Sequence, residues 1–328
     1  MNDQSILVLG SNSFSGSSFA SSLPPNWSKH LVFRTPLPSR LFSAEILMNE
    51  GDTLTQWNLN ENSEKILELV KRKKITTIVN FAAQSMVGQS WDQPEDWYEA
   101  NVMSLSKMLN ELRKQVQLNK FIHFSTPEVY GSTTGPVKEN FNFAPNTPYA
   151  ISRAASDWHL KALQENFGFP VIFTRAANVY GEHQRLYRII PRVIISALTG
   201  KKFPLQGGGK SIRSFIHIDD VSDALIAILK DGKIGDSYHI STNELITIYD
   251  LVNVIAEKLN VRIDDLAEIT PDRSGKDFAY QLDSKKIRSE LGWLEKISLS
   301  SGIDRTIHWV EQNLDELKTY PLNYEHKR

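Results

Sequence analysis

Short apolar runs alternate with longer amphipathic stretches along the first half of the chain. The apolar runs predict buried strands at residues 5–9, 30–33, 75–81, 120–124 and 170–174. Helical periodicity, together with helix-start and helix-stop residues, predicts helices at residues 15–23, 64–71, 95–116 and 148–166. Because strands that alternate with helices form parallel sheets covered on both faces, the pattern predicts an α/β fold with a doubly wound parallel sheet.

The pattern changes after Gly181, where the loops lengthen and a glycine turn occupies residues 207–209. We therefore expect one domain over residues 1–180 and a smaller C-terminal α/β substrate domain over residues 181–328. A segment near residues 215–241 is expected to return to the first domain. The polar residues 318–328 are expected to fray.

The first predicted strand runs into a turn rich in glycine and serine. Gly10 and Gly16 allow the backbone to approach a pyrophosphate at the start of the next helix. Ser13 stands where the middle glycine of a Gly-x-x-Gly-x-x-Gly loop would lie, and Phe14 follows it. An ordinary strand-to-helix turn is the alternative. In its strand and helix context, the loop indicates a Rossmann-like domain that binds NAD(P).

The end of the second predicted strand bears on the choice between NAD and NADP. NAD sites usually place Asp or Glu there, on the ribose hydroxyls. Here the strand ends at Arg34, and no acidic residue occurs between Asp3 and Glu45. A cation suits a 2′-phosphate, so we favour NADP over NAD. Alternatively, Arg34 is a solvated surface charge and serine or threonine holds the ribose.

Candidate catalytic groups follow the predicted strand at residues 120–124. Thr126 and Glu128 lie at the carboxyl end of the sheet, where open α/β folds bind ligands. Tyr149 and Arg153 are four residues apart on a predicted helix, so they share one face. A tyrosine base needs its pKa lowered from about 10 by about three units, which takes roughly 4 kcal/mol, and a nearby cation supplies part of that. Taken singly, Tyr149 could be a surface or core tyrosine and Glu128 a solvated loop charge. Taken together, the four residues indicate a catalytic site.

Composition narrows the possible partners and location. The formal net charge is -1, which provides no overall field to recruit nucleic acid or an anionic membrane. The chain contains no cysteine, its start lacks a basic signal-peptide region, and residues 6–9 are too few to span a bilayer. The eight histidines show no metal-ligand spacing. We therefore expect a cytoplasmic protein without a metal site, a nucleic-acid partner or a membrane partner.

The chain resembles the extended short-chain dehydrogenase/reductase family, and within it the dTDP-glucose 4,6-dehydratases. The resemblance covers nearly the whole length, and no single motif carries it. Beyond the glycine loop, the matching segments are residues 80–85, 101–102, 125–131, 174–181, 190–193, 207–213, 272–277 and 291–293.

The resemblance implies a role for each matching residue. For the cofactor, the implied residues are Gly10, Phe14 and Gly16 at the pyrophosphate, Asn58 and Leu59 at the adenine, Ala82 and Ala83 after the fourth strand, and Tyr149 with Arg153. Ser13 in the glycine loop and Arg34 at the end of the second strand join this list because of their positions. For the chemistry, Thr126 would hydrogen-bond the sugar 4-hydroxyl, Glu128 would act as the base at C5, and Tyr149 would take the 4-hydroxyl proton. For the substrate, the implied residues are Ser85, Thr126, Asn178, Arg192, and, on the diphosphate, Arg213 and Arg273. Relatives often dimerise through the helices at residues 95–116 and 148–166, so a homodimer is expected.

Two positions depart from the family pattern. Arg153 stands where the family usually has lysine, which makes a proton relay through this side chain doubtful. Pro127 stands where dTDP-glucose dehydratases have an aspartate that acts as the acid for water loss. GDP-mannose dehydratases have a small residue there, so Glu128 could both remove the C5 proton and deliver it to the departing hydroxyl.

These observations favour a nucleoside-diphosphate-hexose 4,6-dehydratase with a tightly bound, regenerated NAD(P). An epimerase or a UDP-glucuronate decarboxylase of the same family is the first alternative, since both share the initial oxidation. A non-catalytic NAD(P)-binding sensor is the second, because Ser13, Pro127 and Arg153 all depart from the family pattern.

Overall fold

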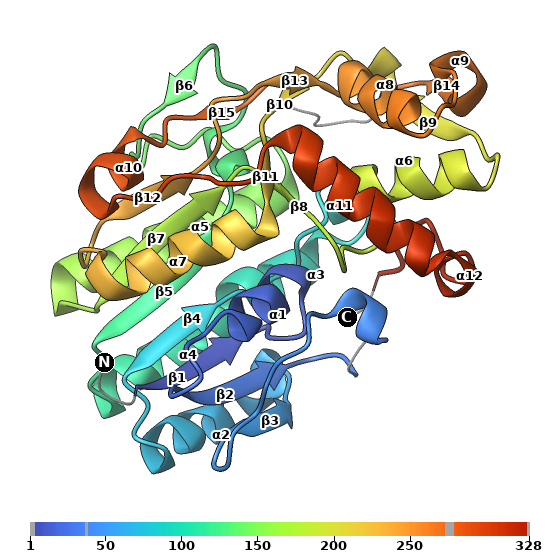
Figure 1. The fold of residues 1–328 in the computed structure, drawn as a ribbon. Helices are drawn as coiled ribbons and strands as arrows, with labels where there is room; N and C mark the ends of the chain where they lie inside the picture. The colour runs from blue at the N-terminus through green and yellow to red at the C-terminus, as the bar shows by residue number, and fades with distance from the viewer. Residues whose placement is uncertain (1–3, 37–38, 273–278, 327–328) are drawn as a thin grey trace.

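A seven-stranded parallel sheet forms the centre of the molecule (Figure 1). The computed structural model describes residues 4–36, 39–272 and 279–326. From one edge to the other, the strands are β12 (Ser237–Ile240), β7 (Val171–Ala176), β5 (Lys120–Ser125), β4 (Thr77–Asn80), β1 (Ser5–Leu9), β2 (Ser28–Phe33) and β3 (Thr53–Gln56). The strand order reverses direction beside β1, which is the arrangement of a doubly wound sheet. The predicted Rossmann-like α/β fold is confirmed.

The strands are apolar throughout because both faces of the sheet are buried. In β1, Ile6 and Val8 point into one core, and Leu7 and Leu9 point into the other. The first face carries α1 (Phe14–Ser21) and α7 (Ile218–Asp231). The second face carries α2 (Leu59–Arg72), α4 (Ser104–Gln115) and α5 (Pro148–Phe167).

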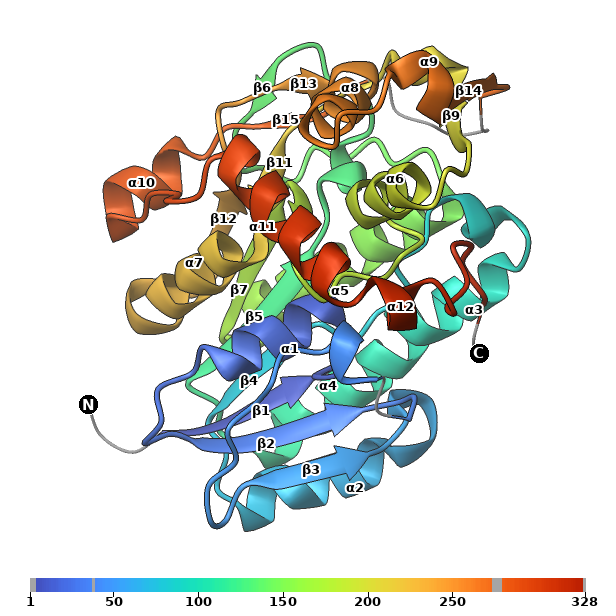
Figure 2. The ribbon, with the colours of Figure 1, turned by 45° about the vertical axis from the view of Figure 1, so that its right-hand side comes forward.

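The rest of the chain surrounds a third core above the carboxyl ends of the strands (Figures 1 and 2). Its helices are α6 (Ile189–Leu198), α8 (Ile248–Lys258), α9 (Ile263–Leu266), α11 (Leu299–Gln312) and α12 (Leu314–Leu317). Short strand pairs accompany them: β8 (Asn178–Tyr180) with β11 (Phe215–His217), β9 (Phe203–Gln206) with β14 (Ala267–Thr270), and β10 (Ile212–Arg213) with β13 (Ile246–Thr247). The pair β6 (Pro136–Val137) and β15 (Gln281–Leu282) and the helix α10 (Lys285–Leu291) lie nearer β12.

Three elements differ from the sequence-based expectation. The strand β3 was not predicted, because its exposed edge alternates polar and apolar residues weakly. The single helix expected over residues 95–116 is divided into α3 (Pro94–Tyr98), a π-helical turn (Glu99–Met103) and α4. The expected fraying is wrong for residues 318–326, which pack against other parts of the chain.

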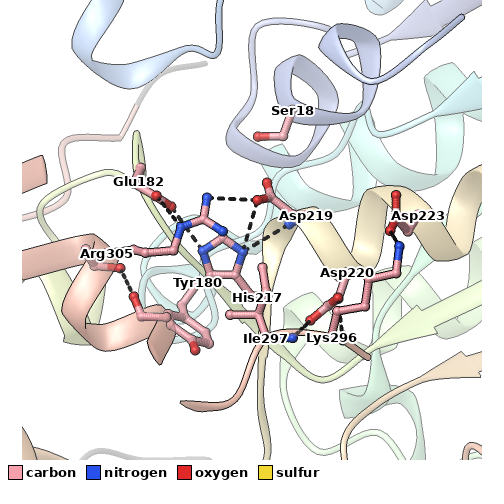
Figure 3. A network of polar contacts seen from close by, with 12 residues as sticks. Ser18, Tyr180, Glu182, His217, Asp219, Asp220, Asp223, Lys296, Ile297 and Arg305 are labelled. Carbon is pink, nitrogen blue, oxygen red and sulfur yellow. Dashed lines mark hydrogen bonds and ion pairs between the residues drawn. The ribbon is translucent and has the colours of Figure 1, made fainter. Parts of the chain in front are cut away.

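A polar network connects α11 to the start of α7 (Figure 3). The buried His217 accepts the Asp219 N–H at Nδ1 (3.2 Å), so its Nε2 carries the proton and donates to Glu182 (3.0 Å). Arg305 donates to the carboxylates of Glu182 and Asp219, at 2.8 Å each. Burial alone would raise the pKa of Glu182, but the hydrogen bonds from His217 and Arg305 lower it to about 2, so this carboxylate stays charged. The network thereby fixes the third core against the central sheet.

Candidate active site

The turn between β1 and α1 brings two glycines against neighbouring backbone. Gly10 has a φ of +75°, and a Cβ there would lie 2.8 Å from the Ala82 backbone nitrogen. A Cβ on Gly16 would lie 2.3 Å from the Gly10 carbonyl oxygen. Because only glycine fits at both positions, the backbone packs closely at the start of a helix, and a glycine turn in this place suits a pyrophosphate.

Ser13 takes the place of the middle glycine and has a structural task of its own. It is the N-cap of α1, where its hydroxyl accepts the Gly16 N–H (3.1 Å) and donates to the Gly10 carbonyl (2.7 Å). A capping serine stabilises a helix start by about 1 kcal/mol. The departure at Ser13 therefore stabilises the loop conformation, and Phe14 next to it is partly buried.

The side chains predicted at the adenosine end lie at the carboxyl ends of β2 and β3. Arg34 follows β2 and is partly buried. Burial lowers its pKa, while Tyr324 and Asp96 oppose that shift. Asn58 follows β3 and caps α2, accepting the Asn60 N–H (3.1 Å).

The remaining residues predicted on the cofactor side lie beside these elements. Leu59 opens α2 and packs partly against its core. Ala82 and Ala83 follow β4, and Ala83 is exposed.

The predicted catalytic side chains Thr126, Glu128 and Tyr149 meet at the carboxyl end of β5. Thr126 lies near enough to the Tyr149 phenol to lower its pKa, and the Glu128 carboxylate acts electrostatically on the same phenol. Tyr149 is 7% exposed, and it is the second residue of α5. Burial, and then Glu128, raise its pKa to about 12, although Arg153 and Thr126 act in the opposite direction. The phenol is therefore protonated at neutral pH in this state.

Pro127 has a local structural explanation. Thr126 is the N-cap of the 3-10 turn Pro127–Tyr130, and its hydroxyl accepts the Glu128 N–H (3.4 Å). Pro127 occupies the first position of that turn, where a missing N–H costs nothing. The proline fixes the backbone that carries Glu128 but offers no proton.

Arg153 lies behind the tyrosine, almost completely buried. Its Nη2 donates to the Phe124 carbonyl at 2.5 Å and lies 3.3 Å from His123 Nε2. Burial, Arg153 and Arg175 hold the pKa of His123 well below its usual range, so His123 is neutral. The arginine is thus tied to β5, one helical turn from Tyr149.

A buried carboxylate balances part of this positive charge. Asp157, on α5, accepts from Arg175 (2.6 Å) and from Ser125 (2.9 Å), and lies 3.4 Å from His123. Asn80 contacts the other nitrogen of His123 (3.3 Å). A continuous polar chain therefore runs from the catalytic helix through β5 to the end of β4.

The π-helical turn positions Asn101, which sequence analysis noted only as part of a motif. The buried side chain accepts the Gln84 N–H (2.8 Å), and donates to the Gln84 carbonyl (3.0 Å) and to the Ser152 hydroxyl (2.9 Å). It therefore fastens the loop after β4 to the helix of Tyr149. π-Helical turns are frequent at functional sites.

The predicted substrate residues Asn178 and Arg213 form a second group with a residue that was not predicted. Arg213 lies over the Tyr280 ring, 4.5 Å from its centroid, and Tyr280 donates to Asn178 Oδ1 (2.9 Å). Arg273 lies outside the described residues. Tyr280 had no distinguishing sequence signal, because it lies outside every motif that carried the resemblance.

Arg188 is the second functional candidate that the sequence did not reveal. It precedes α6, donates to the exposed Ser85 hydroxyl (3.4 Å) and opposes the rise in the Tyr149 pKa. Its loop follows Gly181, where the pattern became irregular. The nearby Arg192, also predicted to bind substrate, donates to Asn323 (3.2 Å).

A cavity of about 340 Å³ lies elsewhere, between α1, α7 and α11. Its lining includes Ser18 and Ser21, together with Glu182, Asp219 and Arg305 of the network in Figure 3. None of the predicted site residues that the structure describes lines it. The lining charges pair with one another, so the cavity offers no unpaired charge to a ligand. Among the described residues, no cluster of three or more His, Asp or Glu could hold a metal ion, and no helix is long and apolar enough to cross a membrane.

Known proteins resemble this chain over most of its length. The family model described as GDP-mannose 4,6 dehydratase matches residues 7–306. The dTDP-glucose 4,6-dehydratase of Xanthomonas campestris is 31% identical over 84% of this chain and 87% of its own. A trifunctional UDP-glucose 4,6-dehydratase/UDP-4-keto-6-deoxy-D-glucose 3,5-epimerase/UDP-4-keto-L-rhamnose-reductase of Arabidopsis thaliana is 31% identical over 75% of this chain, which spans only 37% of the plant protein.

A solved structure gives the same result. The dTDP-glucose 4,6-dehydratase of Streptomyces venezuelae, with NAD bound, superposes with a TM-score of 0.88 at 28% identity, covering 95% of this chain and 98% of that one. The match spans the sheet, the catalytic helix and the third core alike. The chain belongs to the GDP-mannose 4,6 dehydratase family, within the extended short-chain dehydrogenases/reductases, and is most like the dTDP-glucose 4,6-dehydratases.

Proposed function

We propose that this protein is a nucleoside-diphosphate-hexose 4,6-dehydratase, a hydro-lyase that uses a bound nicotinamide nucleotide. The observation that carries the proposal is the meeting of Thr126, Glu128 and Tyr149 at the carboxyl end of β5. Tyr149 can accept a proton from a sugar hydroxyl, and the Glu128 carboxylate can remove a proton from the adjacent carbon. A non-catalytic sensor would not require this arrangement.

The residues present fit a dinucleotide cofactor. Gly10 and Gly16 allow the close backbone packing of the turn that leads into α1, and a glycine turn of this kind suits a dinucleotide pyrophosphate. A bound nicotinamide would supply the hydride acceptor for oxidation at the sugar C4 and the hydride donor for reduction at C6. Tyr149 and Arg153 would lie along the cofactor, and Arg153 would favour the phenolate over the phenol.

The identity of the dinucleotide is a further part of the proposal. Arg34 supports NADP, because a guanidinium at the end of β2 would pair with a 2′-phosphate. The NAD bound in the Streptomyces relative supports the other choice. Comparing the Kd of NAD with that of NADP, in the wild type and in Arg34→Gln, decides between them: an NADP preference that the substitution removes supports our assignment.

The protein groups act on protons in two steps. Tyr149, with Thr126 donating to its oxygen, takes the proton of the sugar 4-hydroxyl as C4 is oxidised. The resulting ketone acidifies the C5 hydrogen, and Glu128 removes it. Since Pro127 has no proton to give, Glu128 then delivers the same proton to the departing 6-hydroxyl, and water is lost. A second proton, taken from solvent by Glu128, is added to C5 as the hydride reaches C6.

The substrate would extend from this point into the third core. Arg213 and Asn178, grouped around Tyr280, would hold the diphosphate and the adjoining sugar. Arg188, whose charge acts on Tyr149, and its hydrogen-bond partner Ser85 would contact the hexose. This division supports a cofactor domain over residues 1–180, with the return of β12 to the sheet, and a nucleotide-sugar domain over most of residues 181–328.

Product analysis tests the reaction. The purified protein is incubated with dTDP-glucose, UDP-glucose, GDP-mannose and UDP-glucuronate, and the products are analysed by mass spectrometry. We expect loss of one water from at least one of the hexose nucleotides. An unchanged mass with inverted stereochemistry would identify an epimerase, and release of carbon dioxide from UDP-glucuronate would identify a decarboxylase.

A homodimer is also proposed, and a cytoplasmic location stays a prediction. Large apolar side chains are exposed on the helices predicted to form the interface: Tyr98 (37%), Met103 (60%), Ile151 (42%) and Trp158 (48%). Exposed apolar surface of this kind marks association sites. Light scattering of the wild type should give twice the chain mass, and Trp158→Glu should shift it toward the monomer.

A further inference from the structure

The segment from Lys318 to His326 crosses the surface beside the cofactor site. It follows α12, whose Leu317 is buried in the third core. The Tyr320 ring then packs edge-on against Phe42, with centroids 4.9 Å apart. In Figure 2 the last described residues lie next to α3, more than two hundred positions earlier in the sequence.

Two residues of this segment, Tyr324 and His326, contact different parts of the molecule. On the third-core side, Tyr324 packs edge-on against Tyr187, with centroids 5.2 Å apart. On the side of the sheet, His326 stacks on Trp97 (4.9 Å, 12° between planes) and contacts the Asp96 carboxylate at 2.7 Å. The segment therefore connects the loop before α6 to α3.

Tyr324 lies at the edge of the site through its immediate neighbours. The guanidinium of Arg188 lies over the Tyr187 ring, 5.6 Å from its centroid, and reaches Ser85 (3.4 Å). On the other side, the charge of Arg34 at the end of β2 interacts with Tyr324 and Asp96. The Tyr324 hydroxyl lies 3.4 Å from Nδ1 of His326, and burial raises its pKa, so the hydroxyl stays neutral.

We propose that this segment is a clasp over the adenosine half of the cofactor site, in which Tyr324 contacts the bound dinucleotide and His326 holds the clasp closed against Asp96 and Trp97. The inference rests on the proposed function, because it takes the ligand to be a nicotinamide dinucleotide. The charges of Arg34 and Arg188 both act on the Tyr324 hydroxyl, which could turn from His326 Nδ1 to a ribose or pyrophosphate oxygen. The clasp slows release of the cofactor, which a dehydratase regenerates in each turnover and has no need to exchange.

The test is the dissociation rate of NADH and NADPH. It is followed as the change in nucleotide fluorescence after mixing with an excess of the non-fluorescent oxidised nucleotide. Tyr324→Ala and His326→Ala are compared with the wild type and with Glu325→Ala. Glu325 is exposed and lies between the two contact residues, so it is the matched control. Losing an aromatic contact of this kind predicts release about tenfold faster in both variants and unchanged release in the control.

Two further readings separate the causes. Thermal melting shows whether each variant keeps its fold, and Tyr324→Phe isolates the hydroxyl: intermediate release supports a contact between the hydroxyl and the dinucleotide. Wild-type release rates in folded Tyr324→Ala and His326→Ala would overturn the clasp alone. A wild-type protein that binds neither nucleotide would instead overturn the proposed function.

Discussion

Replacing Arg153 by methionine should move the pH dependence of the reaction. The phenol of Tyr149 has a pKa of about 12 in the absence of ligands, so it must fall by several units for the phenolate to form near neutrality. The charge of Arg153, one helical turn from Tyr149, lowers the pKa of the phenol and so opposes the effect of burial. At a separation of about 6 Å and an effective dielectric constant of about 20, a unit charge contributes about 3 kcal/mol, or about two pKa units.

The sign follows from the charged form of tyrosine. Removing a cation disfavours the phenolate, so the pKa rises and the rising limb of the kcat profile moves to higher pH by about two units. At a fixed pH below that limb, kcat falls about 100-fold. The assay is the initial rate of product formation across the pH range in which melting shows an intact fold.

The control is Arg153→Lys, which keeps a cation and a donor for the Phe124 carbonyl. We expect its profile to lie close to that of the wild type. A methionine variant with reduced kcat but an unshifted profile would refute the reasoning, because the arginine would then act only through structure.

Three further substitutions probe separate parts of the site. Gly16→Ala places a Cβ 2.3 Å from the Gly10 carbonyl, so we expect cofactor Kd to rise about tenfold or more, measured by calorimetry; an unchanged Kd would contradict the cradle. Glu128→Gln should lower product formation about thousandfold and stop deuterium exchange at C5 in D₂O, while transient reduction of the cofactor persists; continued exchange would assign the base elsewhere. Asn101→Ala strands the Gln84 backbone groups and should cost about 3 kcal/mol in the free energy of unfolding, measured with urea; a change below about 0.5 kcal/mol would show that these groups find other partners.

The sheet and its catalytic edge were predictable because their signals are local. Apolar runs specify strands buried on both faces, and the order of strands and helices specifies a parallel sheet. The positions of Thr126 and Glu128 follow from the carboxyl end of β5, where open α/β sheets bind ligands. The position of Tyr149 was predicted only as the start of a helix.

The residues that the sequence did not reveal depend on contacts between distant segments. Arg188 reaches Ser85 across about a hundred positions, and Tyr280 reaches Asn178 across a similar distance. The segment with Tyr324 was expected to fray because its composition is polar, but aromatic partners and the Asp96 carboxylate hold it. No periodicity within a segment reports such pairings.

The transfer of a label from C4 to C6 tests the central claim most directly. A nucleoside-diphosphate glucose carrying deuterium at C4 is incubated with the protein in ordinary water, and the product is examined by NMR and mass spectrometry. If Tyr149, Glu128 and the nicotinamide act on one sugar ring, the product lacks one water and carries the deuterium on C6. Deuterium that remains at C4 in a product that has lost no water would contradict the account.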